Sequence, residues 1–143
     1  MIRINKTAIL LACIMSFLST HSVADVVVIV NPNSSVSEID DTWLGAIFLG
    51  KRKDFPDGSS AVPVEQKPGT SARDEFNEKI INKEEAELRA YWAQQIFSGK
   101  GQPNTIVSGD ADVKKLVSEN PAMIGYIDAS KVDETVKVIL KLE

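Results

Sequence analysis

One short segment has the residue types to bind an anion, and it runs from Lys67 to Arg73. A Gly69-Thr70-Ser71 turn at the start of a helix leaves several backbone N–H groups unpaired at the positive end of the helix dipole. Thr70 and Ser71 add hydroxyls, and Lys67 and Arg73 add charge. We therefore predict that these five residues bind a small anion. A simpler interpretation has Ser71 as a helix N-cap and both cations on the solvated surface.

Carboxylates offer a second kind of chemistry. Glu38, Asp40 and Asp41 lie close together in the sequence and could serve carboxylate catalysis or a divalent cation. Acidic residues also favour the first turn of a helix, where the dipole is positive, and this explains the three side chains better. A hydrolase is further disfavoured because no motif pairs a nucleophile with a base. We expect a non-enzymatic protein with no catalytic residue, no metal and no cofactor.

The start of the chain is typical of a secretion signal. Two basic residues precede an apolar run from Ala8 to Leu18, and Ser22-Val23-Ala24 supplies the small residues that a signal peptidase reads. We therefore predict that residues 1–24 are a signal peptide cleaved after Ala24. On this prediction, residues 25–143 form one periplasmic domain.

Two other fates of this segment are less favoured. An uncleaved anchor needs about 20 apolar residues to span a bilayer, and the run is shorter than that. Leu10-Leu11-Ala12-Cys13 resembles a lipoprotein processing site. However, the apolar run continues past Cys13 to Leu18, so cutting there would halve the hydrophobic segment.

Cleavage after Ala24 would remove the only cysteine, Cys13, and the only histidine, His21. The remaining domain would then have no disulfide, no Cys or His nucleophile and no Cys/His metal site. The whole chain has 16 basic and 20 acidic residues, a net charge of −4. Nucleic-acid binding is therefore not expected, because it requires a basic face.

Apolar runs and turn residues predict the strands. Val26–Val30 is an unbroken β-branched run, typical of a strand that is buried on both faces of a sheet. In the last strand, Val136, Val138, Leu140 and Leu142 should face inward. The predicted strands are Val26–Val30, Ala61–Val64, Thr105–Val107, Met123–Ile127 and Val136–Leu142.

Capping residues followed by helical spacing predict the helices between those strands. In the third helix, Leu88, Trp92 and Ile96 share one stripe, so we expect Trp92 to belong to the core. Alternation of strands and helices indicates an α/β domain with a mixed sheet flanked by helices. The predicted N-caps are Ser37, Thr70 or Ser71, and Asn82, and Asp110 begins the fourth helix.

Four segments in this order and at this spacing resemble one known family. They are Ile47–Lys51, Gly69–Ser71, Tyr91–Gly99 and Pro121–Tyr126. Together they resemble the phosphate ABC transporter substrate-binding proteins. The resemblance implies the type 2 periplasmic-binding-protein-like fold, although this chain resembles a short, single-lobe member. It also implies a ligand such as phosphate or a similar small oxyanion, and a partner among envelope transporters.

The ligand segment departs from the family pattern. The family places an Arg, an Asp and a Ser before the Gly-Thr pair, where this chain has Val64, Gln66 and Pro68. Only Gly69 and Thr70 carry over. The resemblance therefore implies an exported binding protein that holds its oxyanion weakly. The alternative is a ligand-free interaction module of the cell envelope that keeps the lobe fold and docks on another envelope protein.

Overall fold

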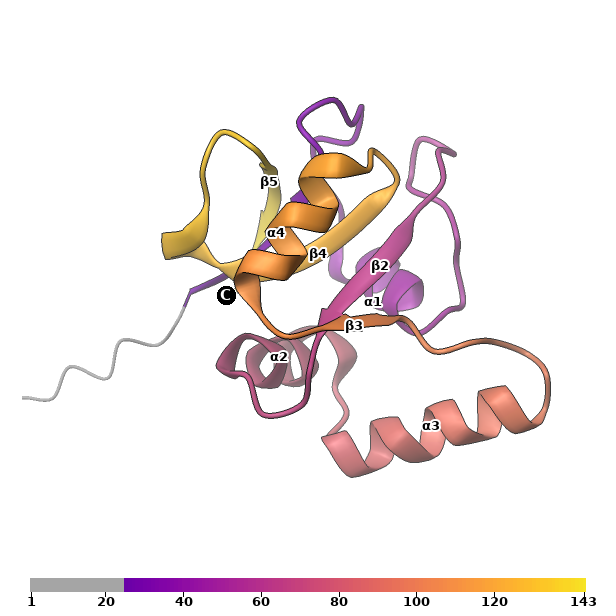
Figure 1. Ribbon diagram of the computed structural model, residues 1–143. Helices are drawn as coiled ribbons and strands as arrows, with labels where there is room; N and C mark the ends of the chain where they lie inside the picture. The colour runs from indigo at the N-terminus through magenta and orange to yellow at the C-terminus, as the bar shows by residue number, and fades with distance from the viewer. Residues whose placement is uncertain (1–24) are drawn as a thin grey trace, which may run out of the picture.

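The computed structural model describes residues 25–143 as an α/β domain (Figure 1). The predicted signal peptide, including Cys13 and His21, lies outside the described residues. A five-stranded sheet has the order β3-β2-β4-β1-β5. The strands are β1 (Val26–Val30), β2 (Val62–Gln66), β3 (Thr105–Val107), β4 (Met123–Asp128) and β5 (Lys137–Lys141).

The sheet is mixed, as predicted. Strand β2 pairs parallel with β3 and β4, and β1 pairs antiparallel with β4 and β5. The helical elements are α1 (Asp41–Phe48), α2 (Ser71–Phe76), the π-helical turn η1 (Asn77–Ile81), α3 (Glu85–Phe97), α4 (Asp110–Glu119) and the 3-10 turn η2 (Ala129–Lys131).

Helices cover both faces of the sheet and create two apolar cores. Figure 1 shows α4 across the near face and α1 behind the sheet. Val27 and Ile29 of β1 pack in the core beneath α4, with Val113 and Val117. The alternate residues of β1 pack in the larger core with α1 and α2. The prediction that this strand is buried on both faces is confirmed.

Two predicted helix starts are wrong. Helix α1 is capped by Asp40, whose Oδ1 accepts the N–H of Trp43 at 2.7 Å, and not by Ser37. The later start leaves Ile39 in extended chain, from which it enters the core. Asn82 does not cap α3 either. It has left-handed φ and ψ angles of 56° and 38°, closes the turn η1, and leaves Glu84 at the N-cap.

The prediction for the last strand is correct at its ends, where Val136 and Leu142 are buried, and wrong between them. A bulge between Val28 and Ile29 shifts the register of β1 against β5. Ile139 is therefore buried, and Val138 is 40% exposed. An extra residue at a bulge reverses which side chains face the core, and local alternation cannot reveal it.

Helix α3 lies apart from the rest of the domain. It projects beneath the sheet in Figure 1, and a loop returns the chain to β3. Leu88 is its only buried residue. The expected stripe is thus only partly correct, because Trp92 is half-buried and Ile96 is 51% exposed. Among residues 25–143, no helix has the length and apolar character needed to cross a membrane.

Candidate anion-binding turn between β2 and α2

The predicted anion segment lies at the carboxyl end of β2. The Lys67 N–H still donates to the Val107 carbonyl at 2.8 Å, so the turn begins beside the end of β3. It then leads directly into α2. Open α/β sheets bind ligands at the carboxyl ends of their strands, next to helix N-termini. The position of the segment is therefore suitable for a ligand.

The backbone conformation of the turn depends on Gly69. Its φ is +94°, a value that residues with a Cβ rarely adopt. Of the two predicted N-caps, Thr70 caps α2 and Ser71 is its first residue; Thr70 Oγ1 accepts the N–H of Arg73 at 3.3 Å. The same hydroxyl donates to the Lys67 carbonyl at 3.3 Å. Thr70 thus uses its side chain to close the turn.

The turn still offers donors to a ligand. Within the described part of the chain, the backbone N–H groups of residues 69–72 donate to no protein acceptor. Ser71 and Lys67 are exposed, and Lys67 forms no ion pair with any described residue. Backbone amides, one hydroxyl and one ammonium therefore remain available at the turn.

Arg73 lies away from those donors. Its side chain points into the domain and is 5% exposed. Nη1 donates to the Gln66 carbonyl at 2.8 Å and lies 3.7 Å from Oε2 of Glu65, and Nη2 donates to Oε2 of Glu85 at 3.2 Å. The guanidinium is therefore paired with two carboxylates and one carbonyl of the domain itself. The expectation that it gives its charge to an anion, and the simpler interpretation that it is solvated, both disagree with this placement.

The residues around Arg73 have shifted pKa values. Burial raises the pKa of the Glu65 carboxyl, and the nearby charge of Arg73 opposes that rise. The hydrogen bond from Arg73 lowers the pKa of Glu85. Burial, followed by the charge of Glu65, raises the pKa of the Tyr126 hydroxyl. That hydroxyl accepts the N–H of Gln66 at 3.2 Å, so the cluster fixes the end of β2.

Two of the three residues that replace the family's ligand residues, Val64 and Gln66, have structural contacts, and the third, Pro68, is exposed. Val64 is fully buried in the core beneath α4. Nε2 of Gln66 donates to Oδ1 of Asp110 at 2.7 Å and to the Tyr126 carbonyl at 3.0 Å. Asp110 Oδ1 also accepts the N–H of Asp128 at 3.2 Å, so these bonds join the ends of β2 and β4 to the start of α4. Neither Val64 nor Gln66 is free to contact an ion.

The polar cluster around Arg73 was not predicted from the sequence. Its members are Glu65, Glu85, Asn77 and Tyr126, and Asn77 Nδ2 donates to Glu85 Oε1 at 2.8 Å. A usable signal was Glu65, a charged residue directly after the predicted strand Ala61–Val64, which the structure includes in β2. Such a residue is almost never fully buried unless it is paired.

A hollow beside α2 is a poor alternative for an anion. It has a volume of about 510 Å³ and lies between η1 and the start of α3. Its lining includes the carboxylates of Asp74, Glu78, Glu84, Glu85 and Glu87, which would repel a negative ligand. In the described residues, no group of three or more His, Cys, Asp or Glu side chains is arranged to hold a metal ion.

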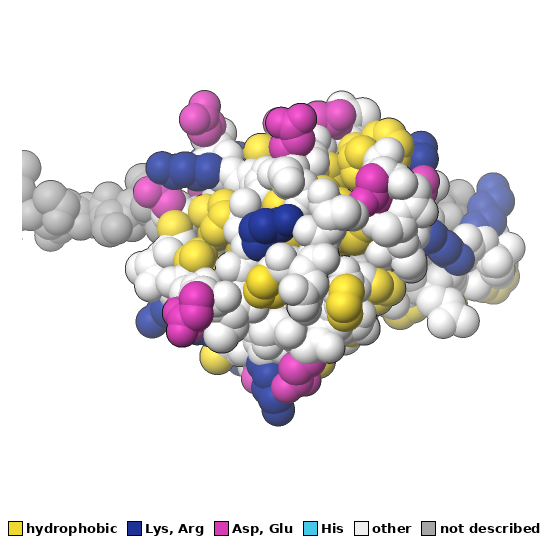
Figure 2. All heavy atoms as spheres, turned by 90° about the horizontal axis from the view of Figure 1, so that it is seen from above, with side chains coloured by type: hydrophobic (Ala, Val, Ile, Leu, Met, Phe, Trp, Pro, Cys, Tyr) yellow, Lys and Arg dark blue, Asp and Glu magenta, His cyan; other side chains and the backbone are white. Residues whose placement is uncertain are grey.

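Charge on the upper face of the molecule is mixed. Figure 2 shows basic and acidic side chains interspersed there, with apolar side chains between them and no large basic patch. A nucleic-acid surface would require a continuous basic stripe. This face therefore gives no support to a nucleic-acid partner.

Similar proteins were found only among solved structures. No protein-family model matches the chain, and no curated protein does. One match is a Clostridium perfringens protein described as a phosphate ABC transporter substrate-binding protein, with bound phosphate. It is 25% identical, with a TM-score of 0.65, and the match covers 82% of this chain and 45% of that one.

Two further matches have the same character. A Vibrio cholerae ABC-type phosphate transport receptor is 19% identical with a TM-score of 0.62, over 82% of this chain and 46% of that one. The PstS protein of Borrelia burgdorferi is 14% identical with a TM-score of 0.60, over 80% and 46%. The chain thus spans less than half the length of these proteins, and its mixed sheet with flanking helices has the fold of one part of a phosphate ABC transporter substrate-binding protein.

Proposed function

We propose that this chain is an exported, non-enzymatic binding protein that takes phosphate or a similar small oxyanion at the turn between β2 and α2. The observation that carries the proposal is the set of unpaired backbone N–H groups at residues 69–72, beside exposed Lys67. Support also comes from the Clostridium perfringens match, whose structure contains phosphate. The partner would be an envelope transporter or another envelope protein.

The contacts at the turn predict weak binding. Gly69, Thr70 and Ser71 supply amides, and Lys67 supplies charge, whereas Arg73 acts only by holding the Gln66 carbonyl at the base of the turn. One lobe cannot enclose the ion or exclude water from it. Affinity should therefore be nearer millimolar than micromolar, about −4 rather than −8 kcal/mol. It should fall as salt rises, because exposed charges are screened.

The proposal predicts a local response to phosphate. At low ionic strength, a titration followed by amide resonances should shift the signals of residues 69–72 most. Lys67→Ala should weaken binding up to about fivefold, the range of a single exposed charge pair. Lys131→Ala is the matched control, because Lys131 is also exposed but lies on η2. The Lys131→Ala variant should bind phosphate with the same affinity as the unmodified protein.

The same titration discriminates the alternative function. If residues 69–72 do not move in phosphate or sulfate at low ionic strength, the oxyanion proposal fails. The ligand-free interaction module of the envelope then becomes the better function. A response that is equally large in unrelated loops would indicate non-specific ion effects and would also reject the proposed turn.

The proposed export with cleavage after Ala24 predicts the first residue, and therefore the mass, of the mature protein. Protein recovered from the envelope fraction should begin at Asp25, because Ser22-Val23-Ala24 satisfies the cleavage rule for small residues. Intact mass spectrometry measures this directly. A species that begins at Cys13 and carries lipid would show lipoprotein processing instead, and full-length protein would show that the segment is retained.

A further inference from the structure

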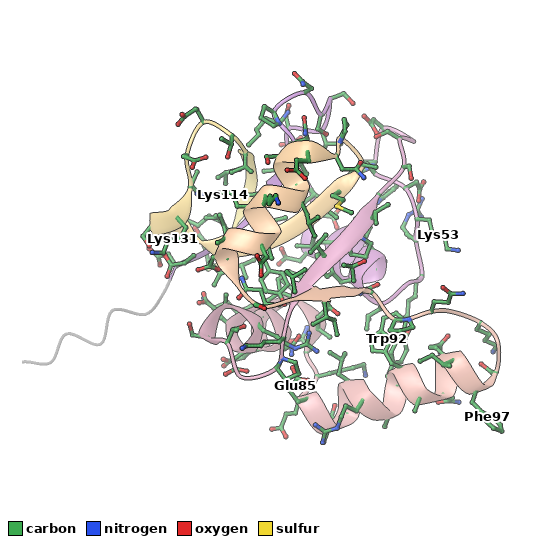
Figure 3. The ribbon with its side chains drawn as sticks, viewed as in Figure 1. Lys53, Glu85, Trp92, Phe97, Lys114 and Lys131 are labelled. Atoms are coloured by element: carbon green, nitrogen blue, oxygen red, sulfur yellow. The ribbon has the colours of Figure 1, made fainter. Side chains whose placement is uncertain are left out.

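The hollow between η1 and the start of α3 is lined mainly by negative charge. Its volume of about 510 Å³ lies within the range of small-molecule pockets. The helical run from Ser71 to Ile81 contributes one part of the lining, and the start of α3 contributes another. Figure 3 shows Glu85 at this start, on the side toward the rest of the domain. Five of the lining residues are acidic and one is basic, so a ligand of this hollow should be positive.

Most of these carboxylates have no cation. Glu85 is paired with Arg73. Lys83, the basic residue of the lining, forms no ion pair with any described residue. The same is true of four lining carboxylates, Asp74, Glu78, Glu84 and Glu87. Four negative charges therefore face one positive charge.

Two further cations lie near the hollow but outside its lining. Lys79 is paired with Glu75 at 2.9 Å. Arg89 lies one turn after Glu85 on α3, where it is exposed and its charge helps to lower the pKa of the Glu85 carboxyl. Neither forms an ion pair with the four unpaired carboxylates among the described residues.

Helix dipoles explain only some of this acidic charge. Glu84 and Glu87 lie at the start of α3, where the dipole favours a carboxylate. Glu78 lies in the last four residues of the continuous helical run from Ser71 to Ile81, where the dipole disfavours one. It also follows Asp74 by four residues, a spacing at which like charges repel. A cation in the hollow would stabilise both side chains.

Asn77 supplies an independent sign of a ligand. The residue is 4% exposed and lines the hollow. Its Nδ2 donates to Oε1 of Glu85 at 2.8 Å, which fixes the amide, because the reverse orientation would set two acceptors against each other. Within residues 25–143, its Oδ1 is the one buried side-chain oxygen or nitrogen that has no hydrogen-bond partner. Buried polar atoms are nearly always paired, so this oxygen calls for a donor from the hollow.

The chemistry of the lining favours an organic cation over a metal ion. Carboxylates only accept hydrogen bonds, and an ammonium group only donates them. A metal ion needs several oxygens around one point, and no group of three or more Asp or Glu side chains in the described residues is arranged in this way. The unpaired carboxylates come instead from α2, η1 and the start of α3. A flexible cation with several ammonium groups can reach them separately.

We propose that the hollow between η1 and α3 binds a small polyamine. Its ammonium groups pair with the four free carboxylates, and one N–H donates to Asn77 Oδ1. The proposal does not rest on oxyanion binding, because none of residues 67–73 lines the hollow. Affinity should fall as salt rises, because the carboxylates are exposed.

A titration of the full chain with spermidine at low ionic strength tests the proposal. Backbone amide resonances of residues 74–87 should shift and saturate, and so should the side-chain amide resonances of Asn77. Butylamine carries a single ammonium group, so it should bind at least about tenfold more weakly than spermidine, at a loss of about 1.4 kcal/mol or more. Mg²⁺ is the control for general screening of an acidic surface, and it should produce no saturable shift at the same concentrations.

Substitutions locate the site. Glu78→Gln should weaken spermidine binding about two- to fivefold, the range of one exposed charge pair. Glu134→Gln is the matched control and should leave the affinity unchanged, because Glu134 is also exposed but lies between η2 and β5. Circular dichroism verifies that each variant is folded.

Three results would overturn the polyamine site. One is a spermidine titration in which residues 74–87 do not show a saturable shift. Another is equal binding of Mg²⁺ or butylamine, since the hollow would then hold a metal ion or a single charge. The third is an equal loss in Glu78→Gln and Glu134→Gln, which would indicate attraction to the whole acidic surface.

Discussion

Arg73→Met is expected to lower the free energy of unfolding by about 3–5 kcal/mol, as measured by urea denaturation. The guanidinium forms ion pairs with Glu65 and Glu85, and the side chain is 5% exposed. Methionine fills most of the apolar volume but leaves two carboxylates without their cation. The cost is the burial of uncompensated negative charge, together with the lost hydrogen bond to the Gln66 carbonyl. The denaturation midpoint should fall while the slope stays unchanged.

A second substitution separates the charge effect from simple loss of packing. Glu65→Gln in the Arg73→Met background removes the more deeply buried carboxylate, so it should restore part of the lost stability. The coupling between the two positions is then obtained from a double-mutant cycle. If Arg73→Met unfolds at the same urea concentration as the unmodified protein, Arg73 is solvated and available to an anion after all.

The loss caused by Arg73→Met should also shrink in acid. In the unmodified protein, Arg73 lowers the pKa of Glu85, so that contribution to stability is present above the ordinary pKa of glutamate and is lost as pH falls through the lowered value. In the variant, burial without a cation should raise the carboxylate pKa values. Protonation of these carboxylates then removes the uncompensated negative charge as pH falls. The free energies of unfolding of the variant and the unmodified protein should therefore approach each other.

The turn between β2 and α2 shows how far sequence reasoning reaches. Gly69 and Thr70 act through their own backbone and their nearest neighbours, so the turn and the N-cap were predictable. The direction of Arg73 was not. It depends on Glu65 on the adjacent strand and on Glu85, which is supplied by the next helix. Spacing within one helix cannot indicate which charges from other elements will meet a side chain.

The strands and helices also divide into features that the local sequence predicts and features that depend on contacts with distant residues. Strand β1 follows from a short apolar run, and the start of α4 at Asp110 follows from a capping pattern; the structure confirms both. The inward residues of β5 depend on a bulge in its pairing with β1, which lies more than a hundred residues earlier in the chain. The half-buried state of Trp92 depends on how far α3 stands from the sheet. Both features are tertiary, and they override local periodicity.

Phe76→Ala should lower the free energy of unfolding by about 3–5 kcal/mol, the usual range for a large buried aromatic residue. Phe76 is fully buried at the end of α2. Its ring lies 4.6 Å from that of Phe48 and is stacked on Tyr126 at 4.2 Å, measured between ring centres. Alanine would leave a cavity between α1, α2 and β4 that these two rings cannot fill without moving.

The effect of Phe76→Ala should extend to the turn between β2 and α2. Helix α2 is only six residues long, and Phe76 is its largest buried side chain. Hydrogen exchange should therefore show the greatest loss of protection in residues 71–76, beside the turn that supplies the anion donors.

Phe76→Leu is the matched control. It retains most of the volume, so its cost should be about 1 kcal/mol, and the turn should keep its protection. If leucine and alanine are equally costly, ring stacking on Tyr126 outweighs the cavity. If neither changes the denaturation midpoint, the aromatic cluster does not anchor α2, and the geometry of the turn must rest on the Arg73 ion pairs alone.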